Sequence, residues 1–267
     1  KLKALFNENR ADFEAKWNDI KIVLEYGMLS EDKFYEKAGA FVLYPTVNNT
    51  YFTLEELKEK LKENQTNKDG KLVVLYAGNK EEQHSYIETA KEKGYEVLLL
   101  DSPIISHLIQ KIENDNTDLT FVRVDSDHID NLIKKDENTI SKLSDEEKET
   151  LKTSLEAYIP KAYSVQLEAM DSQAAPFIIT QPEFMRRMKE MSQSGGGGMF
   201  GMNNMPEMYN LVVNTNSDLA TSILNTEDKT HQEHLVKQAL DLAKLSQNLL
   251  KGEALTAFVK RSFEMIK

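Results

Sequence analysis

Cysteine is absent from the 267 residues, and no hydrophobic run is long enough to span a bilayer. Without cysteine there is neither a disulfide framework nor a thiolate metal site, which fits a reducing compartment such as the cytoplasm. A transmembrane helix needs ~20 predominantly apolar residues, and the longest apolar runs fall well short of that length. We therefore expect no membrane association.

Positive charge is also scarce, because 33 lysines and arginines face 44 aspartates and glutamates, which gives a net charge of -11. A protein that binds duplex nucleic acid needs a basic face to neutralise phosphates, and no basic cluster is present, so nucleic acid is not an expected partner. The chain starts without methionine, in a segment with helical spacing, and we expect it to be part of a longer protein.

Motifs for catalysis or metal binding are missing as well. Gly78 follows a predicted strand, but it has neither the repeated glycines of a dinucleotide site nor the spacing of a phosphate-binding loop. His231 and His234 could share a metal ion, but exposed histidines at a polar helix start are the better interpretation. Aspartates 125, 127 and 130 around His128 are expected to form a solvated loop and helix cap. We expect no enzyme activity, no metal and no cofactor in this chain.

What the chain has in abundance is methionine around one short segment. Seven of the ten methionines fall between Phe184 and Met208, around four consecutive glycines at 195–198. Unbranched thioether side chains adapt to partners of different shape, and consecutive glycines make a continuous helix expensive, so the segment predicts an adaptable apolar surface on a mobile element. The alternative is that these methionines are ordinary core residues.

Two domains are expected from the length, at 1–133 and 134–267, with a charged stretch at the boundary. In the first domain, apolar runs at 71–77, 96–100 and 119–124 predict three strands, and the helical pattern at 81–93 predicts a βαβ unit with parallel strands. Its fold class is therefore α/β, with a small parallel three-stranded sheet. Helical spacing at 2–26 and a capping box at Thr53 and Glu56 predict further helices.

The second domain is predicted to be α+β. A capping box at Ser144 and Glu147 starts a helix, and alternating residues after Pro160 predict strands near 163–167, 176–180 and 208–213, which we expect to form a small antiparallel three-stranded sheet. Three helices should follow, at about 216–224, 231–250 and 253–267.

The last two helices have apolar residues over more of their circumference than one core can cover. A second copy of the chain is the economical partner for the uncovered face, which predicts a homodimer through a helical bundle; the alternative is that both helices fold back on their own domain. The residues expected in this dimer interface are Leu242, Leu245, Leu249, Phe258, Phe263 and Ile266.

A further set of segments occurs in a characteristic order: Trp17, 26–28, 71–79, 93–100, 165–167, 175–179 and the helices to Lys267. Together they resemble the heat-shock protein 90 chaperone family, and most closely its bacterial, high-temperature protein G type. No single motif is specific, but their order along nearly the whole chain is. The chain resembles the end of the family's middle domain followed by its C-terminal dimerisation domain.

The resemblance implies a role in binding non-native client proteins. In this family an amphipathic helix of the C-terminal domain takes part in client binding, and ATP and magnesium bind in an N-terminal region that this sequence does not match. Many bacterial relatives place a tryptophan at a client contact of the middle domain, whereas the matching position here is His107. The residues expected to bind clients are Phe184, Met185, Met188, Met191, Met199, Phe200 and Met202.

The function expected from the sequence is thus that of a chaperone segment that homodimerises and binds client protein through a Met/Phe-rich helix. A dimerisation scaffold with no client site of its own is the alternative, in which the methionines are core residues. An enzyme that uses the βαβ unit is a third possibility, and nucleotide would then raise its melting temperature.

Overall fold

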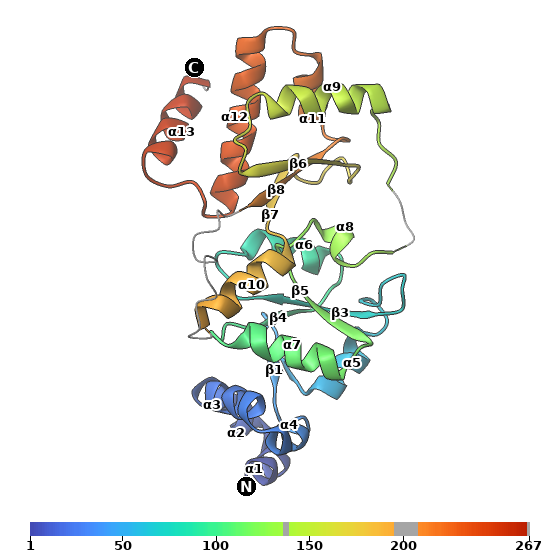
Figure 1. Ribbon diagram of the computed structural model, residues 1–267, viewed down its shortest axis with the longest axis vertical. Helices are drawn as coiled ribbons and strands as arrows, with labels where there is room; N and C mark the ends of the chain where they lie inside the picture. Colours follow the sequence, from blue (N-terminus) through green and yellow to red (C-terminus); the bar gives the residue numbers. More distant parts are fainter. Residues whose placement is uncertain (136–138, 195–207, 266–267) are drawn as a thin grey trace. The chain divides into compact units, whose positions relative to one another are not determined.

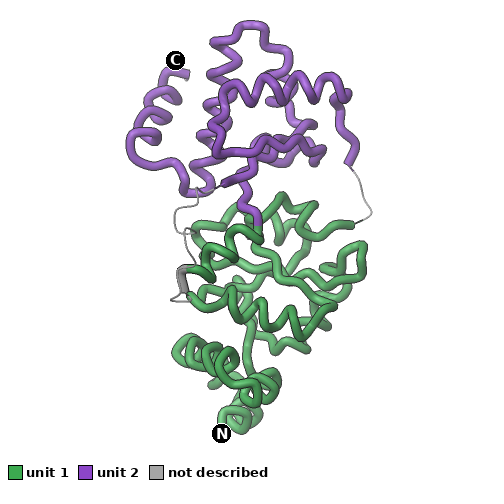
Figure 2. Tube along the Cα trace, in the orientation of Figure 1, with its two compact units in different colours: residues 1–135, 183–205 green, residues 136–182, 206–267 purple. Residues whose placement is uncertain are grey.

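The computed structural model describes residues 1–135, 139–194 and 208–265. These residues divide into two compact units (Figure 2). Unit 1 comprises residues 1–135 and 183–205, and unit 2 comprises residues 136–182 and 206–267. The first division lies close to the predicted boundary at 133/134. The helix that carries Met185, Met188 and Met191, however, groups with unit 1, as part of residues 183–205.

Unit 1 begins with short helices where the sequence predicted one helical opening. Asn9 interrupts the helix with a non-helical backbone, and its side chain accepts a hydrogen bond from the Asp12 N–H, so it caps the next helix. Phe13 and Trp17 are fully buried and anchor these helices on the rest of the unit. The elements are α1 (Leu2–Glu8), α2 (Arg10–Ala15), α3 (Trp17–Ser30), α4 (Asp32–Ala38), β1 (Tyr44–Pro45) and β2 (Tyr51–Phe52).

The α/β part of unit 1 confirms the predicted βαβ arrangement. Thr53 and Glu56 form both hydrogen bonds of the predicted capping box at the start of the first helix. The strand that follows is buried along its whole length, as its apolar run indicates. The elements are α5 (Leu54–Leu61), β3 (Leu72–Ala77), α6 (His84–Glu92), β4 (Val97–Leu99), α7 (Ile105–Asp115), β5 (Leu119–Arg123) and α8 (Ile129–Leu132).

The three strands form a parallel sheet in the order β4-β3-β5. The chain moves from β3 to β4 on one side and then crosses back over β3 to β5, and right-handed crossovers place α6 and α7 on opposite faces (Figure 1). The strand order therefore reverses between β3 and β5, and β5 is an edge strand. The helix α10 (Glu183–Ser194) packs beside α7 in the same unit.

Unit 2 has the predicted α+β class, but its sheet is mixed. The strand β8 lies in the centre, parallel to β6 and antiparallel to β7, so the two strands expected to pair with each other are not neighbours. The reason is burial: Leu211, Val212 and Val213 are fully buried, which suits a central strand, whereas β6 is half polar. The elements are α9 (Asp145–Glu156), β6 (Tyr163–Glu168), β7 (Phe177–Thr180), β8 (Tyr209–Asn214), α11 (Asp218–Asn225), α12 (Lys229–Ser246) and α13 (Gly252–Met265).

The core of unit 2 lies between this sheet and the helices. Ser144 and Glu147 form the predicted capping box of α9, and Leu151 and Leu155 of that helix are fully buried. One side of α12 completes the core with Val236, Ala239 and Leu240. In the described ranges, no helix has both the length and the apolar character needed to cross a bilayer.

Candidate functional site

The helix α10 presents apolar side chains to solvent. Phe184 is 72 % exposed and Met185 is 37 % exposed, while Met188 and Met191 are half-buried. None of these four side chains belongs to the buried core of the described residues. The other expected client-binding residues, Met199, Phe200 and Met202, lie outside the described part of the chain.

The opposite side of α10 is charged, and this side faces the unit. We call it the inner face, and it consists of Glu183, Arg186, Arg187 and Glu190. Arg186 is only 4 % exposed; its guanidinium donates to Glu183 Oε1 over 2.6 Å and to Glu190 Oε1 over 2.6 Å. It also donates to the hydroxyl of Tyr76, a buried residue of β3. The helix is therefore docked by ion pairs instead of by its apolar residues.

The ionisation of Glu183 reflects this environment. Burial alone would raise the pKa of its carboxyl group, but the adjacent guanidinium groups of Arg186 and Arg187 outweigh burial and lower the pKa below its usual range. Burial likewise raises the pKa of Tyr76, with the Glu183 carboxylate adding to the effect. At neutral pH the carboxyl group of Glu183 is thus ionised between two guanidinium groups, and the Tyr76 phenol beside it is neutral.

A cleft of about 410 Å³ opens at the carboxyl ends of β3 and β4, beside α10. Its lining includes Gly78, Ser102, Arg123 and Arg186. Gly78 follows β3 and Arg123 ends β5, so the cleft extends to the reversal point between these strands, where α/β folds bind ligands. Its two guanidinium groups are already neutralised, since Arg123 pairs with Asp125 at 2.5 Å and Arg186 with the two glutamates of the inner face.

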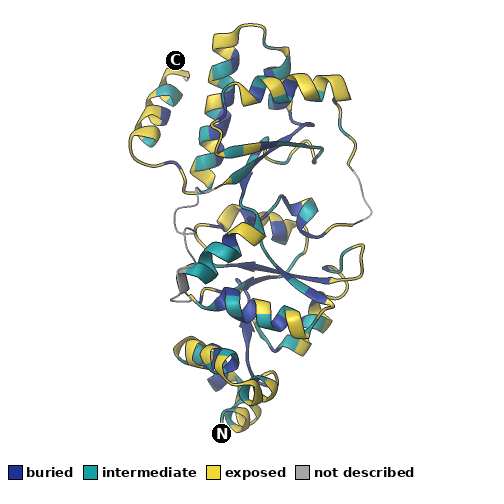
Figure 3. Cartoon of the chain, viewed as in Figure 1, coloured by how far each residue is buried: buried dark blue, intermediate teal, exposed yellow. Residues whose placement is uncertain are grey.

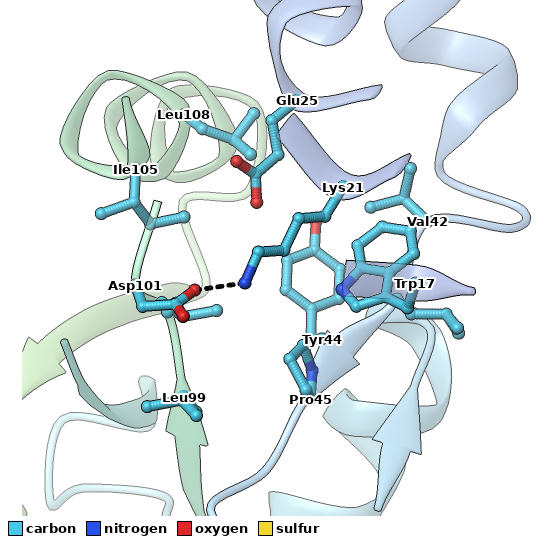
Figure 4. A pocket seen from close by; sticks show the side chains of 12 residues that line it. Trp17, Lys21, Glu25, Val42, Tyr44, Pro45, Leu99, Asp101, Ile105 and Leu108 are labelled. Carbon is cyan, nitrogen blue, oxygen red and sulfur yellow. Dashed lines mark hydrogen bonds and ion pairs between the residues drawn. The ribbon is translucent and has the colours of Figure 1, made fainter. Parts of the chain in front are cut away.

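A second, smaller cavity of about 10 Å³ lies where α3 meets the sheet and α7 (Figure 4). Glu25 of α3 points into it between Lys21 and Leu108, and beside it Lys21 forms an ion pair with Asp101 at 2.5 Å. Glu25 is 6 % exposed, and its Oε2 atom has no hydrogen-bond partner within the described chain. Burial raises the pKa of Glu25, with Asp101 acting in the same direction, and Lys21 and a hydrogen bond from Ser102 opposing it.

In unit 2, part of α12 and α13 faces solvent (Figure 3). Leu242 is 51 %, Leu245 44 % and Leu249 36 % exposed, and Phe263 of α13 is 65 % exposed. Phe258, in contrast, is only 7 % exposed and lies under the Arg261 guanidinium, so it packs within its own unit. Ile266 lies outside the described residues. Leu242 and Leu245 lie three positions apart on the side of α12 opposite its core residues, and Leu249 follows the end of the helix.

The histidines and aspartates singled out in the sequence do not gather into a site. His231 and His234 are both exposed, as expected. Asp125 is 9 % and His128 is 4 % exposed, so the expectation of a solvated loop was wrong for these two residues. Asp125 can be buried because it forms a bidentate ion pair with Arg123. In the ranges that the structure describes, no group of three histidines and carboxylates could hold a metal ion.

Sequence reasoning missed the inner face and Glu25. The inner face repeats at intervals of three, one and three residues, which places all four charges on one side of a helix. That spacing was a readable signal that α10 has a charged side. Nothing in it indicated that this side is the buried one, because the partners of the four residues lie 60 to 110 positions away. For Glu25 the only signal was its place beside Leu24 and before Met28, on the apolar side of a helix.

The exposed apolar side of α10 and the exposed leucines of α12 are apolar patches of the kind found at interaction sites. No family model matches the chain. Curated relatives do: the chaperone protein HtpG of Bacteroides thetaiotaomicron is 36 % identical over 334 residues, which covers 100 % of this chain and 49 % of the relative. HtpG of Porphyromonas gingivalis is 39 % identical over 249 residues, with 92 % of this chain and 36 % of the relative covered.

The chain therefore belongs to the chaperone class of proteins. It is a member of the HtpG group of the heat-shock protein 90 family, as the resemblance predicted, and it matches the C-terminal part of those relatives. The chain spans about half the length of the curated relatives from Bacteroides.

Proposed function

We propose that this part of the chaperone binds non-native client protein through the exposed side of α10. The observation that supports it is the exposure of Phe184 and Met185 on a helix whose charged side is used for docking. Burying one such side chain in a complex stabilises it by roughly 1.5–3 kcal/mol before the costs of association. Contacts of this size are individually weak and replaceable, which suits broad and reversible binding.

The test is a double substitution, Phe184→Ser with Met188→Ser. We expect its affinity for a labelled, permanently unfolded protein, such as reduced and carboxymethylated α-lactalbumin, to fall by about tenfold or more, as measured by fluorescence anisotropy. The matched control is Val23→Ser, because Val23 is an apolar residue of α3 that is 69 % exposed. Equal affinities for the double variant and the control would contradict the proposal.

We further infer that two copies of the chain associate through α12 and α13. The exposed side chains of Leu242, Leu245, Leu249 and Phe263 support this inference. Leu242→Glu with Leu245→Glu should yield monomers in sedimentation across dilution, while Ile140→Glu, at an apolar position 86 % exposed elsewhere in unit 2, should not. A scaffold without client binding is the second candidate; it predicts dimers whose affinity for the unfolded probe is insensitive to α10.

The ATP-driven cycle belongs, in this proposal, to a region that precedes the matched half of the relatives. The chain itself then binds neither ATP nor magnesium and is not an enzyme; its partners are a second copy and client proteins, in the cytoplasm. Adding MgATP should leave its melting temperature unchanged, whereas a rise would indicate a nucleotide site in this part of the protein.

A further inference from the structure

The edge strand β5 has no neighbouring strand on its outer side among the residues that the structure describes. Its outward backbone groups nevertheless have partners. The Phe121 N–H donates to Glu113 Oε1 over 2.7 Å, and the Phe121 carbonyl accepts from the guanidinium of Arg187. Two residues further on, the Arg123 N–H donates to Glu183 Oε2 over 3.3 Å. Side chains of α7 and α10 therefore take the place of a neighbouring strand.

Arg187 is the residue that joins these groups. Its Nη1 donates to Glu113 Oε2 over 2.7 Å, and its Nε donates to Glu183 Oε1 over 2.6 Å. A planar guanidinium group with several fixed donors defines an orientation as well as a distance. With one donor directed at α7, one at β5 and one at its own helix, Arg187 holds α10 in a single rotational setting.

That setting decides which side of α10 meets solvent. Successive residues of an α-helix are separated by about 100° around its axis, so Phe184 and Met188 are turned away from β5 when Glu183 and Arg187 contact it. Releasing the inner face would allow the apolar side to turn inwards, against the unit.

We propose that Glu113, Glu183 and Arg187 are positioning residues of the client surface: by completing the hydrogen bonds of the β5 edge, they fix α10 with Phe184, Met185 and Met188 outwards. This inference rests on the proposed client binding by α10. It adds that α10 is held in place by hydrogen bonds to the backbone of the edge strand β5, and not by insertion into an apolar groove.

The experiment is a double-mutant cycle of Arg187→Gln and Glu113→Gln; in the second variant the amide oxygen of the new side chain still offers an acceptor to the Phe121 N–H. Hydrogen exchange of the amides of residues 184–192 reports docking without any client present. Each single variant should raise the exchange rate by about tenfold, and the double variant should add little to either, because both remove the same interaction. Arg187→Lys should give an intermediate exchange rate, since lysine keeps the positive charge but lacks the several fixed donors of the guanidinium group.

Matched controls are Lys60→Gln and Glu59→Gln, which make the same charge changes at exposed positions of α5. They should leave exchange in α10 unchanged. Affinity for the unfolded probe, measured on the same set of variants, should fall wherever exchange rises.

Unchanged exchange in both single variants, or additive effects in the double variant, would overturn the inference. So would raised exchange with undiminished client affinity, in variants where Phe184→Ser with Met188→Ser still weakens binding. If instead Phe184→Ser with Met188→Ser leaves client affinity unchanged, the proposed function fails, and with it the client role of these residues, while the exchange data still decide whether they dock α10.

Discussion

The helices α10 and α12 are both amphipathic, yet they are docked by opposite sides. The helix α12 buries Val236, Ala239 and Leu240 in the core of unit 2, and α10 directs Glu183 and Arg187 inwards and leaves Phe184 outside. Burial of apolar surface is the dominant favourable term in folding, whereas a buried ion pair roughly repays the cost of removing its charges from water. Docking by charge therefore leaves the apolar residues of α10 exposed, whereas α12 buries one apolar side in the core and exposes Leu242 and Leu245 on the other.

The largest effect is expected at the apolar contact. Leu240→Ala should lower the free energy of unfolding of unit 2 by about 2–5 kcal/mol, because Leu240 is 4 % exposed and its removal leaves a cavity in the core. Urea denaturation measures this loss. Leu242→Ala on the solvent side of the same helix is the control. A loss below ~1 kcal/mol at Leu240 would show that α12 is not docked by burial.

A smaller global effect is expected at the charged contact, although Arg186 is as deeply buried. Removing one partner of a buried ion pair costs about 3–5 kcal/mol if the structure cannot respond. Here α10 can detach and hydrate Glu183 and Glu190, so Arg186→Met should speed hydrogen exchange in α10 and leave the urea midpoint of the β3–β5 sheet nearly unchanged. If Arg186→Met instead destabilised the whole of unit 1 cooperatively, the proposed difference between docking by charge and docking by apolar burial would be wrong.

Glu25 allows a comparison between a buried carboxylate with incomplete pairing and the fully paired Glu183. The pKa of Glu25 is raised above its ordinary value of 4.5 by burial, so its contribution to stability is complete below that pH and is lost as the pH rises through the raised pKa. Glu25→Gln should therefore stabilise unit 1 by about 1 kcal/mol at pH 8 and by progressively less towards pH 4.5, as measured by thermal melting.

Glu183 should behave in the opposite sense, since its pKa is lowered. Its contribution is present above the ordinary carboxyl pKa and is lost as the pH falls through the lowered value. If the melting temperatures of the Glu25→Gln and Glu183→Gln variants changed with pH in the same way, the proposed distinction between the two carboxylates would be wrong.

The smallest effect on stability is expected at Phe184. Phe184→Ser should change the free energy of unfolding by no more than about 0.5 kcal/mol, because its side chain is 72 % exposed and fills no core. Urea denaturation of unit 1 is again the measurement. A loss of several kcal/mol would favour the scaffold function, in which these side chains are structural.

The features that sequence predicted well are local. The capping boxes at Thr53 and Ser144 need only residues three positions apart, and both are present. The βαβ unit follows from apolar runs separated by one helix. The break at Asn9 was missed, because apolar spacing continues across it and only the side-chain cap marks it.

The features that were missed depend on distant partners. The central place of β8 depends on which strand is most buried, and its pairing with β6 joins segments more than 40 residues apart. Phe258 matched the apolar pattern of an interface, but whether it contacts α12 or a second copy cannot be read from spacing. The charged side of α10 was visible as a pattern, but its inward direction was set by β5.

Because side chains occupy the outer edge of β5, detachment of α10 is expected to make the protein prone to aggregation at high concentration. A chain from which α10 has detached exposes the Phe121 carbonyl and the Arg123 N–H on the outer side of β5, where a further strand can pair with them. Two such chains can add to each other edge to edge, a process that is second order in the lifted form. Variants that loosen α10 should thus precipitate more steeply with concentration than variants that weaken the core of unit 2.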